Sequence, residues 1–128
     1  MLEVESLHHV SVAVTDLVGA RRFYGGVLGL REIPRPPFPF EGAWYAVGDR
    51  QLHIIVHPQG RTLRHAPEID SHDGHVALRV SSYARAKAHL EALGVPLRDR
   101  YDNRTPWPQL FLLDPDGNVI ELNADRRE

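Results

Sequence analysis

One short pattern occurs twice in this chain, and the repeat constrains the fold more than any other feature. The first copy is Leu7-His8-His9-Val10-Ser11-Val12-Ala13-Val14, and the second is Gly74-His75-Val76-Ala77-Leu78-Arg79-Val80, with equivalent positions 66 residues apart (76 − 10). Apolar residues at every second position predict a strand with one buried face. His9 and His75 fall on the opposite face, among mostly small residues. The repeat therefore predicts two equivalent strands that each present an imidazole to a cavity.

Each copy is followed by the pattern of one helix and three further strands. The predicted helices cover residues 17–28 and 83–93, with apolar residues at i, i+3, i+7 and i+10. N-caps are expected at Thr15-Asp16 and at Ser81-Ser82, and Gly29 and Gly94 suit the left-handed position that ends a helix. Each half is therefore expected to be β-α-β-β-β. The further strands are predicted at residues 30–33, 43–47, 51–56, 97–100, 109–113 and 118–123.

The duplication also predicts the domain organisation. We expect one domain over residues 1–128, with a first module at about 7–57, a polar connection at 58–73 and a second module at about 74–123. The Pro-rich stretch 34–40 cannot be a central strand or a helix, and it is expected to be a rigid loop with aromatic side chains beside the cavity. The polar tail 124–128 is expected to be frayed.

Composition excludes several classes of function. Hydrophobic residues make up 42% and charged residues 25% of the chain, as in ordinary soluble globular domains. A formal net charge of −2 offers no basic field for nucleic acid or a membrane surface. The apolar runs are shorter than the roughly 18 residues of a membrane-spanning helix, and the start of the chain lacks the pattern of a signal peptide. Cysteine is absent, which excludes thiolate ligands and nucleophiles, and a cytoplasmic location is expected.

Four polar residues occupy two pairs of equivalent positions. His9 and His75 begin the repeated strands, and His53 and Glu121 stand at matching places in later strands, 68 residues apart (121 − 53). A pseudo-twofold axis would bring the four together, and imidazole and carboxylate suit divalent Fe, Mn, Zn, Ni or Co. A single strand histidine is more often a hydrogen-bonded structural residue, but that explanation does not predict the symmetry. His8 is expected to be a neighbour of the site, and the other histidines are expected at the surface or in loops.

Several motifs together resemble those of a known family. They are His8-His9-Val10 through Asp16-Leu17, Phe23-Tyr24 through Leu28-Gly29-Leu30, Gly74 through Leu78, and Asp114-Pro115-Asp116-Gly117-Asn118-Val119-Ile120-Glu121-Leu122. On these motifs the chain, over residues 7–123, resembles the vicinal oxygen chelate superfamily of glyoxalases, bleomycin resistance proteins and extradiol dioxygenases. The resemblance implies an α+β fold of two tandem βαβββ modules, whose curved mixed sheets form a cupped, barrel-like metal cavity. It also implies a homodimer.

The family's ligand positions fall on His9, His53, His75 and Glu121. Glyoxalase I commonly has glutamate or glutamine where this chain has His53, whereas extradiol dioxygenases and fosfomycin-modifying transferases use two histidines and one glutamate. His53 is therefore either a fourth ligand or an acid–base residue, and Glu121 is a ligand that could also move protons.

The function that the resemblance implies is chelation of a small substrate through two adjacent oxygens by a divalent metal ion. We expect a metal-dependent lyase, isomerase or dioxygenase. The alternatives are a fosfomycin-type transferase, for which any thiol must come from a substrate, a bleomycin-resistance-like binding protein without catalysis, and a purely structural dimer module. Arg79, on the face of His75, could hold a carboxylate or phosphonate or be paired at the cavity rim. Candidate cavity walls are Phe38, Phe40, Trp44, Tyr45 and Trp107.

Overall fold

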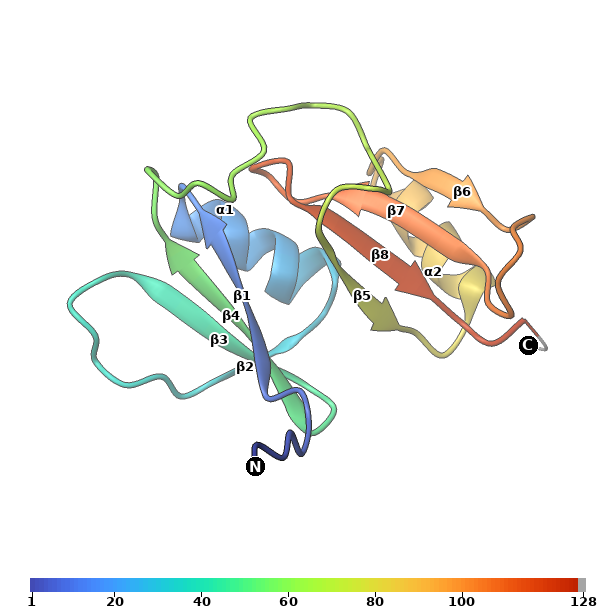
Figure 1. Cartoon of the computed structure of the whole chain (residues 1–128). Helices are drawn as coiled ribbons and strands as arrows, with labels where there is room; N and C mark the ends of the chain where they lie inside the picture. Colours follow the sequence, from blue (N-terminus) through green and yellow to red (C-terminus); the bar gives the residue numbers. More distant parts are fainter. Residues whose placement is uncertain (127–128) are drawn as a thin grey trace. The chain divides into compact units, whose positions relative to one another are not determined.

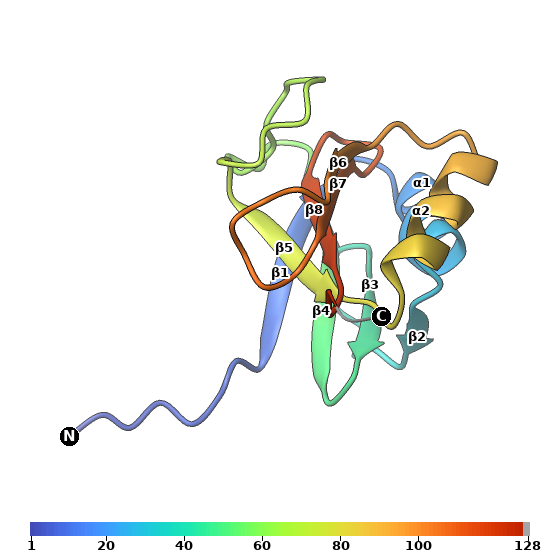
Figure 2. The same ribbon diagram turned by 90° about the vertical axis from the view of Figure 1, so that its right-hand side faces the viewer.

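The computed structural model describes residues 1–126, and the chain forms two compact units that meet at Leu63 and Arg64. This boundary lies inside the connection expected at 58–73. Each unit carries one four-stranded mixed sheet and one helical segment (Figures 1 and 2), so the predicted α+β class with two βαβββ modules is confirmed. Both sheets are open, and neither closes into a barrel.

The sheet of the first unit has the strand order β1-β4-β3-β2. Its strands are β1 (His9–Val14), β2 (Arg31–Ile33), β3 (Gly42–Val47) and β4 (Arg50–Val56). β1 pairs parallel to β4, and β3 pairs antiparallel to β4. In this register His53 lies directly between Ser11 on β1 and Trp44 on β3. The parallel pair therefore brings the face of His9 beside the face of His53.

The sheet of the second unit repeats this topology, with the strand order β5-β8-β7-β6. Its strands are β5 (His75–Arg79), β6 (Arg98–Arg100), β7 (Gln109–Leu113) and β8 (Val119–Asn123). Ala77 lies opposite Glu121, and Arg79 lies opposite Asn123. Ala77 and Glu121 occupy the positions that Ser11 and His53 occupy in the first unit. The duplication predicted from the sequence is therefore present in strand order, direction and register.

The first helical segment is less regular than expected. Asp16 caps α1 (Leu17–Arg21) by accepting a hydrogen bond from the amide of Gly19, but the segment continues as the π-helix η1 (Arg22–Val27). The helix expected over 17–28 is therefore present, and its second half is π-helical instead of α-helical. The neighbours Phe23 and Tyr24 both face the core, where they are 6% and 0% exposed.

The second helix follows the prediction. Ser82 caps α2 (Tyr83–Ala92) through its side chain, and Leu90 is the residue of this helix that is fully buried. Gly94 has a φ of 70°, the left-handed conformation expected at the end of the helix.

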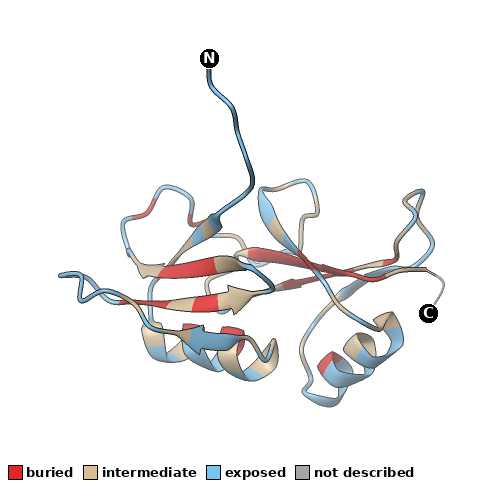
Figure 3. Ribbon diagram, turned by 90° about the horizontal axis from the view of Figure 1, so that it is seen from below, coloured by how far each residue is buried: buried red, intermediate tan, exposed pale blue. Residues whose placement is uncertain are grey.

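The core of each unit lies on its central strands (Figure 3). Leu52 and Ile54 on β4, and Leu110, Leu112 and Ile120 on β7 and β8, are at most 1% exposed. All five residues of β8 are buried, including its polar residues Glu121 and Asn123. Since a buried charge must be compensated, the polar face of β8 needs partners.

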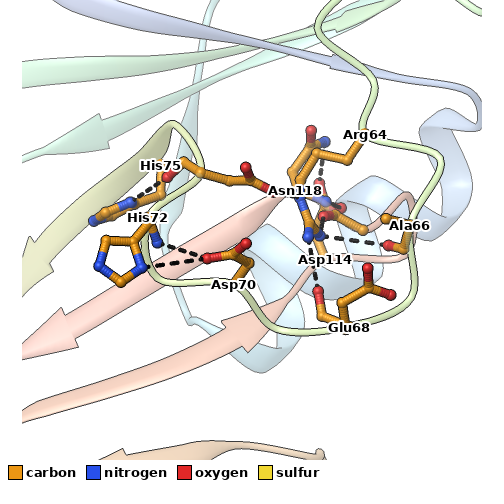
Figure 4. A network of polar contacts seen from close by, with 10 residues as sticks. Arg64, Ala66, Glu68, Asp70, His72, His75, Asp114 and Asn118 are labelled. Carbon is orange, nitrogen blue, oxygen red and sulfur yellow. Dashed lines mark hydrogen bonds and ion pairs between the residues drawn. The ribbon is translucent and has the colours of Figure 1, made fainter.

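An arginine orders the start of the second unit (Figure 4). The side chain of Arg64 is 10% exposed, and it donates hydrogen bonds to the backbone carbonyls of Glu68 at 2.8 Å and Gly117 at 2.7 Å. Its Nε also donates to the carboxylate of Asp73 at 2.7 Å. Gly117 has a φ of 82°, and a Cβ there would lie 2.8 Å from the carbonyl oxygen of Ala66. Arg64 therefore ties the polar connection to the turn before β8.

The expectation of a frayed C-terminal tail is wrong for residues 124–126, and residues 127 and 128 lie outside the described part of the chain. Ala124 is fully buried. Arg126 donates to the carbonyls of Tyr101 and Thr105 and to the side chain of Asn103. These contacts hold the tail against the loop between β6 and β7.

A small polar cluster around the carboxylate of Asp99 joins α2 to β6 in the second unit. Asp99 accepts hydrogen bonds from the hydroxyl of Tyr83 and the amide of Tyr101, and Lys87 lies 3.0 Å from its carboxylate. Burial acts to raise the pKa of Asp99, but these hydrogen bonds and the charge of Lys87 outweigh it and lower the pKa.

We expect Asp99→Asn to lower the free energy of unfolding by about 1–2 kcal/mol at pH 7, after allowance for the partial exposure of this carboxylate. Because the folded-state pKa is lowered, the contribution is present above the unfolded value of about 4 and disappears as pH falls through the folded value. Urea unfolding from pH 7 to pH 2 should show the curves of the wild type and the variant converging in acid. Asp102→Asn, at an exposed neighbouring position, is the control. A difference that persists unchanged at pH 2 would contradict the assignment.

Candidate metal centre

The second unit brings His75 and Glu121 together across the parallel strands β5 and β8. Nε2 of His75 lies 3.1 Å from Oε1 of Glu121, and the two side chains are 24% and 7% exposed. The register explains the contact, since both side chains project from the face opposite the apolar residues Val76 and Ile120. The residues are 46 positions apart in the sequence and meet only through the sheet.

Both members of this pair are held by further hydrogen bonds. Nδ1 of His75 lies 2.7 Å from the carbonyl oxygen of Asp73 (Figure 4), which can only accept, so the proton is on Nδ1. Nδ2 of Asn123 donates to Oε2 of Glu121 at 2.7 Å. Nε2 of His75 and Oε1 of Glu121 are thus aimed at the same place by contacts that use their other polar atoms.

This arrangement fits a divalent metal ion. In a neutral His75 the proton on Nδ1 leaves a lone pair on Nε2, and the lone pair faces a carboxylate oxygen. Two such atoms are compatible at 3.1 Å when a proton or a cation compensates them. Ligand atoms about 2.1 Å from a metal at right angles are about 3 Å apart, which matches the separation here. Hydrogen bonds from a ligating imidazole to a carbonyl, and to a ligating carboxylate from an amide, are the usual supports of metal ligands.

The first unit brings together His9 and His53. Their rings stack with centroids 4.0 Å apart, on the face shared by β1 and β4. Nδ1 of His9 is 2.8 Å from Nδ1 of His8, and Nε2 of His53 is 2.8 Å from Oε1 of Gln51. The amide oxygen of Gln51 accepts, so Nε2 of His53 carries a proton and Nδ1 keeps its lone pair. His8 is a hydrogen-bonded neighbour, as the sequence predicted.

The environment of His53 favours the neutral ring. Burial lowers the pKa of His53, and positive charge on His9, His8 and Arg35 lowers it further. A neutral imidazole is the form that donates a lone pair to a metal or accepts a proton from a substrate.

Aromatic side chains extend this face toward the loop 34–40. Trp44 stacks on His53 with centroids 4.1 Å apart and an interplanar angle of 4°, and Phe38 and Phe40 stack on each other at 5.2 Å. The guanidinium of Arg35 lies about 5 Å from both phenylalanine rings. Phe38 and Phe40 are 42% and 44% exposed, so the row of aromatic side chains formed by Trp44, Phe38 and Phe40 ends in an open apolar surface.

The prediction that Tyr45 is part of the cavity wall is wrong. Tyr45 is 1% exposed and belongs to the core, where its ring lies beside Gly25 and Tyr24. It alternates with Trp44 along β3, so only one of the two can face the histidines. Trp44 is on that face, and Tyr45 is on the other.

The four predicted ligands are therefore found as two pairs, His9 with His53 and His75 with Glu121. Within residues 1–126, no three side chains of histidine, aspartate or glutamate form a group that could hold a metal ion. The four-residue metal site stays a prediction.

Sequence reasoning gave no role to Gln51, Asp73 and Asn123, which support these pairs. Gln51 and Asn123 could have been found, since each stands two residues from a predicted ligand on the same strand face. The backbone carbonyl of Asp73 gives no signal in a sequence.

A duplicated βαβββ architecture with paired imidazole and carboxylate groups defines a class of protein, and comparisons with known proteins agree. Residues 6–122 match the model of the Glyoxalase/Bleomycin resistance protein/Dioxygenase superfamily, so the chain belongs to this superfamily. The chain is 32% identical over 128 residues to Glyoxylase I 4 of Arabidopsis thaliana, covering 97% of this chain and 74% of that protein. It is 28% identical to glutathione transferase FosA of Serratia marcescens, covering 94% and 82%.

A solved structure extends the comparison to three dimensions. The crystal structure of a glyoxalase family protein from Bacillus anthracis superposes with a TM-score of 0.81 at 27% identity, and the match covers 98% of both chains. In the part of the chain that the structure describes, no helix has the length and apolar character needed to cross a membrane.

Proposed function

We propose that this protein is a metal-dependent enzyme that acts on a small molecule bound through two adjacent oxygen atoms. The contact between His75 and Glu121 carries the proposal, because its 3.1 Å separation and its outer hydrogen bonds fit two ligands of one divalent ion. His9, His75 and Glu121 supply ligands, His53 is either the fourth ligand or an acid–base residue, and the ion is Fe, Mn, Zn, Ni or Co. When bound, the ion acts as a Lewis acid on the substrate's oxygens.

The residues of the chain have separate tasks in this proposal. The neutral ring of His53 accepts a proton from the substrate, or completes the ligand set as a fourth member. Glu121 is a metal ligand that also moves protons in this proposal, while Asn123 holds its Oε2. The row from Trp44 to Phe40 excludes water from one side of a planar or apolar substrate. The reaction class is a lyase, isomerase or dioxygenase, carried out in a homodimer in the cytoplasm.

Metal content is the direct test. Protein purified without a histidine tag should contain about one divalent ion per site, and His9→Ala and Glu121→Ala should lose it. His72→Ala is the matched control, since this side chain is 97% exposed and lies three residues from His75. Retention of the ion in His53→Ala favours three ligands and an acid–base role, whereas its loss favours four ligands. Protein that stays metal-free after incubation with all five ions would refute the proposal.

A hydroxamate probes the chelating function, because acetohydroxamate offers two adjacent oxygens. In the cobalt-loaded protein, acetohydroxamate should change the visible absorption of the ion, and a chelator should abolish both the spectrum and any turnover. An unchanged spectrum would exclude a substrate chelated in this way.

A second candidate is a binding protein without catalysis. The open stack of Phe38 and Phe40, continued through Trp44 to His53, is suited to a planar aromatic ligand. This function predicts binding of an aromatic ligand that survives metal removal and the change Glu121→Ala, with no chelator-sensitive turnover. A fosfomycin-type transferase, a third possibility raised by the similarity to FosA, requires a thiol substrate because this chain has no cysteine.

A further inference from the structure

The second unit contains a pocket that neither His75 nor Glu121 lines. Its volume is about 350 Å³, and its walls are Arg79, Pro106, Trp107, Asp125 and Arg126. Ligand pockets for small molecules begin at about 300 Å³, so this one suits a small organic ligand.

Arg79 is held in place at the edge of this pocket. Its Nε donates a 2.6 Å hydrogen bond to Oδ1 of Asn123, which is 9% exposed, and its guanidinium carbon lies 5.8 Å from the centre of the Trp107 ring. The two terminal nitrogens of Arg79 meet no hydrogen-bond acceptor within residues 1–126. A surface arginine normally loses much side-chain freedom when it binds a ligand, and these contacts have already removed part of it.

The wall that carries Trp107 is also ordered. The terminal nitrogens of Arg126 donate hydrogen bonds to Tyr101, Asn103 and Thr105. Asn103 in turn donates to the carbonyl of Trp107 at 3.1 Å. Arg126 therefore positions the loop, and Arg79 presents two terminal nitrogens that bind no acceptor within residues 1–126. Asp125, which has an interaction of its own, supplies the one negative charge, so the lining is net positive by one charge (two arginines, one aspartate).

We propose that this pocket binds the oxyanion of a small organic acid, a carboxylate or a phosphonate, through the terminal nitrogens of Arg79. The planar fork of a guanidinium matches two oxygens of either group. The rings of Pro106 and Trp107 then cover the body of the acid. Arg79 bonds to Asn123, and Asn123 bonds to Oε2 of Glu121. This chain of contacts places the pocket beside the candidate metal ligands, so the acid is the enzyme's substrate, a step that rests on the proposed function.

Binding can be tested without metal, so that its outcome is independent of catalysis. The Trp44→Phe background leaves Trp107 as the only tryptophan, since the chain contains two. In the presence of a chelator, the tryptophan fluorescence is titrated with benzoate, phenylphosphonate and the neutral analogue benzamide. Benzoate, phenylphosphonate or both should give a saturable change, and benzamide should not. The two acids distinguish a carboxylate site from a phosphonate site.

Arg79→Gln should raise the Kd of the acid at least tenfold, and Arg79→Lys, which keeps the charge without the fork, should fall between. Arg85→Gln, an exposed arginine on α2, should bind as the wild type does. Equal affinity for benzoate and benzamide, absence of saturation with both acids, or unchanged binding in a folded Arg79→Gln would overturn the proposal. If Arg79→Gln does not fold, the proposal is decided by comparing the affinities for benzoate and benzamide in the protein that keeps Arg79. If the protein binds the acid but never takes up metal, the acid-binding pocket is supported and the metal-dependent enzyme is refuted.

Discussion

Arg64→Ala is expected to lower the free energy of unfolding by about 3 kcal/mol. The guanidinium is almost fully buried, and its removal leaves the carbonyls of Glu68 and Gly117 without their donors. Hydrogen bonds to a charged group contribute about 1.5–3 kcal/mol each, and the half-exposed partner Asp73 adds less. Urea unfolding monitored by circular dichroism measures the loss.

Arg61→Ala is the matched control, because Arg61 is exposed on the same connection, and its effect should stay within about 0.5 kcal/mol. Arg64→Lys keeps the charge but cannot donate in three directions at once, so it should give an intermediate loss. Arg64 also holds the side chain of Asp73, whose carbonyl orients His75, so Arg64→Ala should weaken metal binding as well. Equal stability of the Arg64→Ala and Arg61→Ala proteins would refute the role given to this residue.

Asn123→Leu is expected to weaken metal binding by about 10- to 100-fold, the usual effect of removing a group that supports a metal ligand. The substitution is similar in size, but it takes the donor from Oε2 of Glu121 and the acceptor from Nε of Arg79. Glu121 is then free to turn away from His75. Affinity is measured by competition with a chromophoric chelator, which requires no knowledge of the substrate.

Gln109→Leu provides the control for this experiment. Gln109 lies directly opposite Asn123 in the antiparallel pair of β7 and β8, but its side chain bonds to Asn103 instead of Glu121. The same amide-to-leucine change should therefore leave metal affinity within about twofold of the wild type. If both variants bind metal as the wild type does, Asn123 has no positioning role. If both lose it equally, the effect belongs to the sheet and not to the contact with Glu121.

Local patterns in the sequence were sufficient to predict most of the architecture. Alternation in residues 7–14 and 74–80 predicted β1 and β5 and the face on which His9 and His75 lie, because neighbouring side chains of a strand must point to opposite sides. The caps at Asp16 and Ser82 are equally local, since each satisfies an amide three residues away.

One departure lies in the first helical segment. The turn Arg22–Val27 is π-helical, although the neighbours Phe23 and Tyr24 are buried as they would be in a regular α-helix. The pattern of apolar residues is the same for both helix types and therefore does not distinguish them.

What the sequence by itself determined is the duplicated order of strands and helices and the choice of four polar residues at equivalent positions. What only the tertiary structure decided is which atoms meet. Three features depend on strands that pair across more than 40 residues: the contact between His75 and Glu121, the orientation of the Asn123 amide, and the terminal nitrogens that Arg79 leaves without an acceptor in the described residues. Such contacts follow from strand register and packing. A local sequence pattern cannot predict them, because the two residues of each contact lie far apart in the chain.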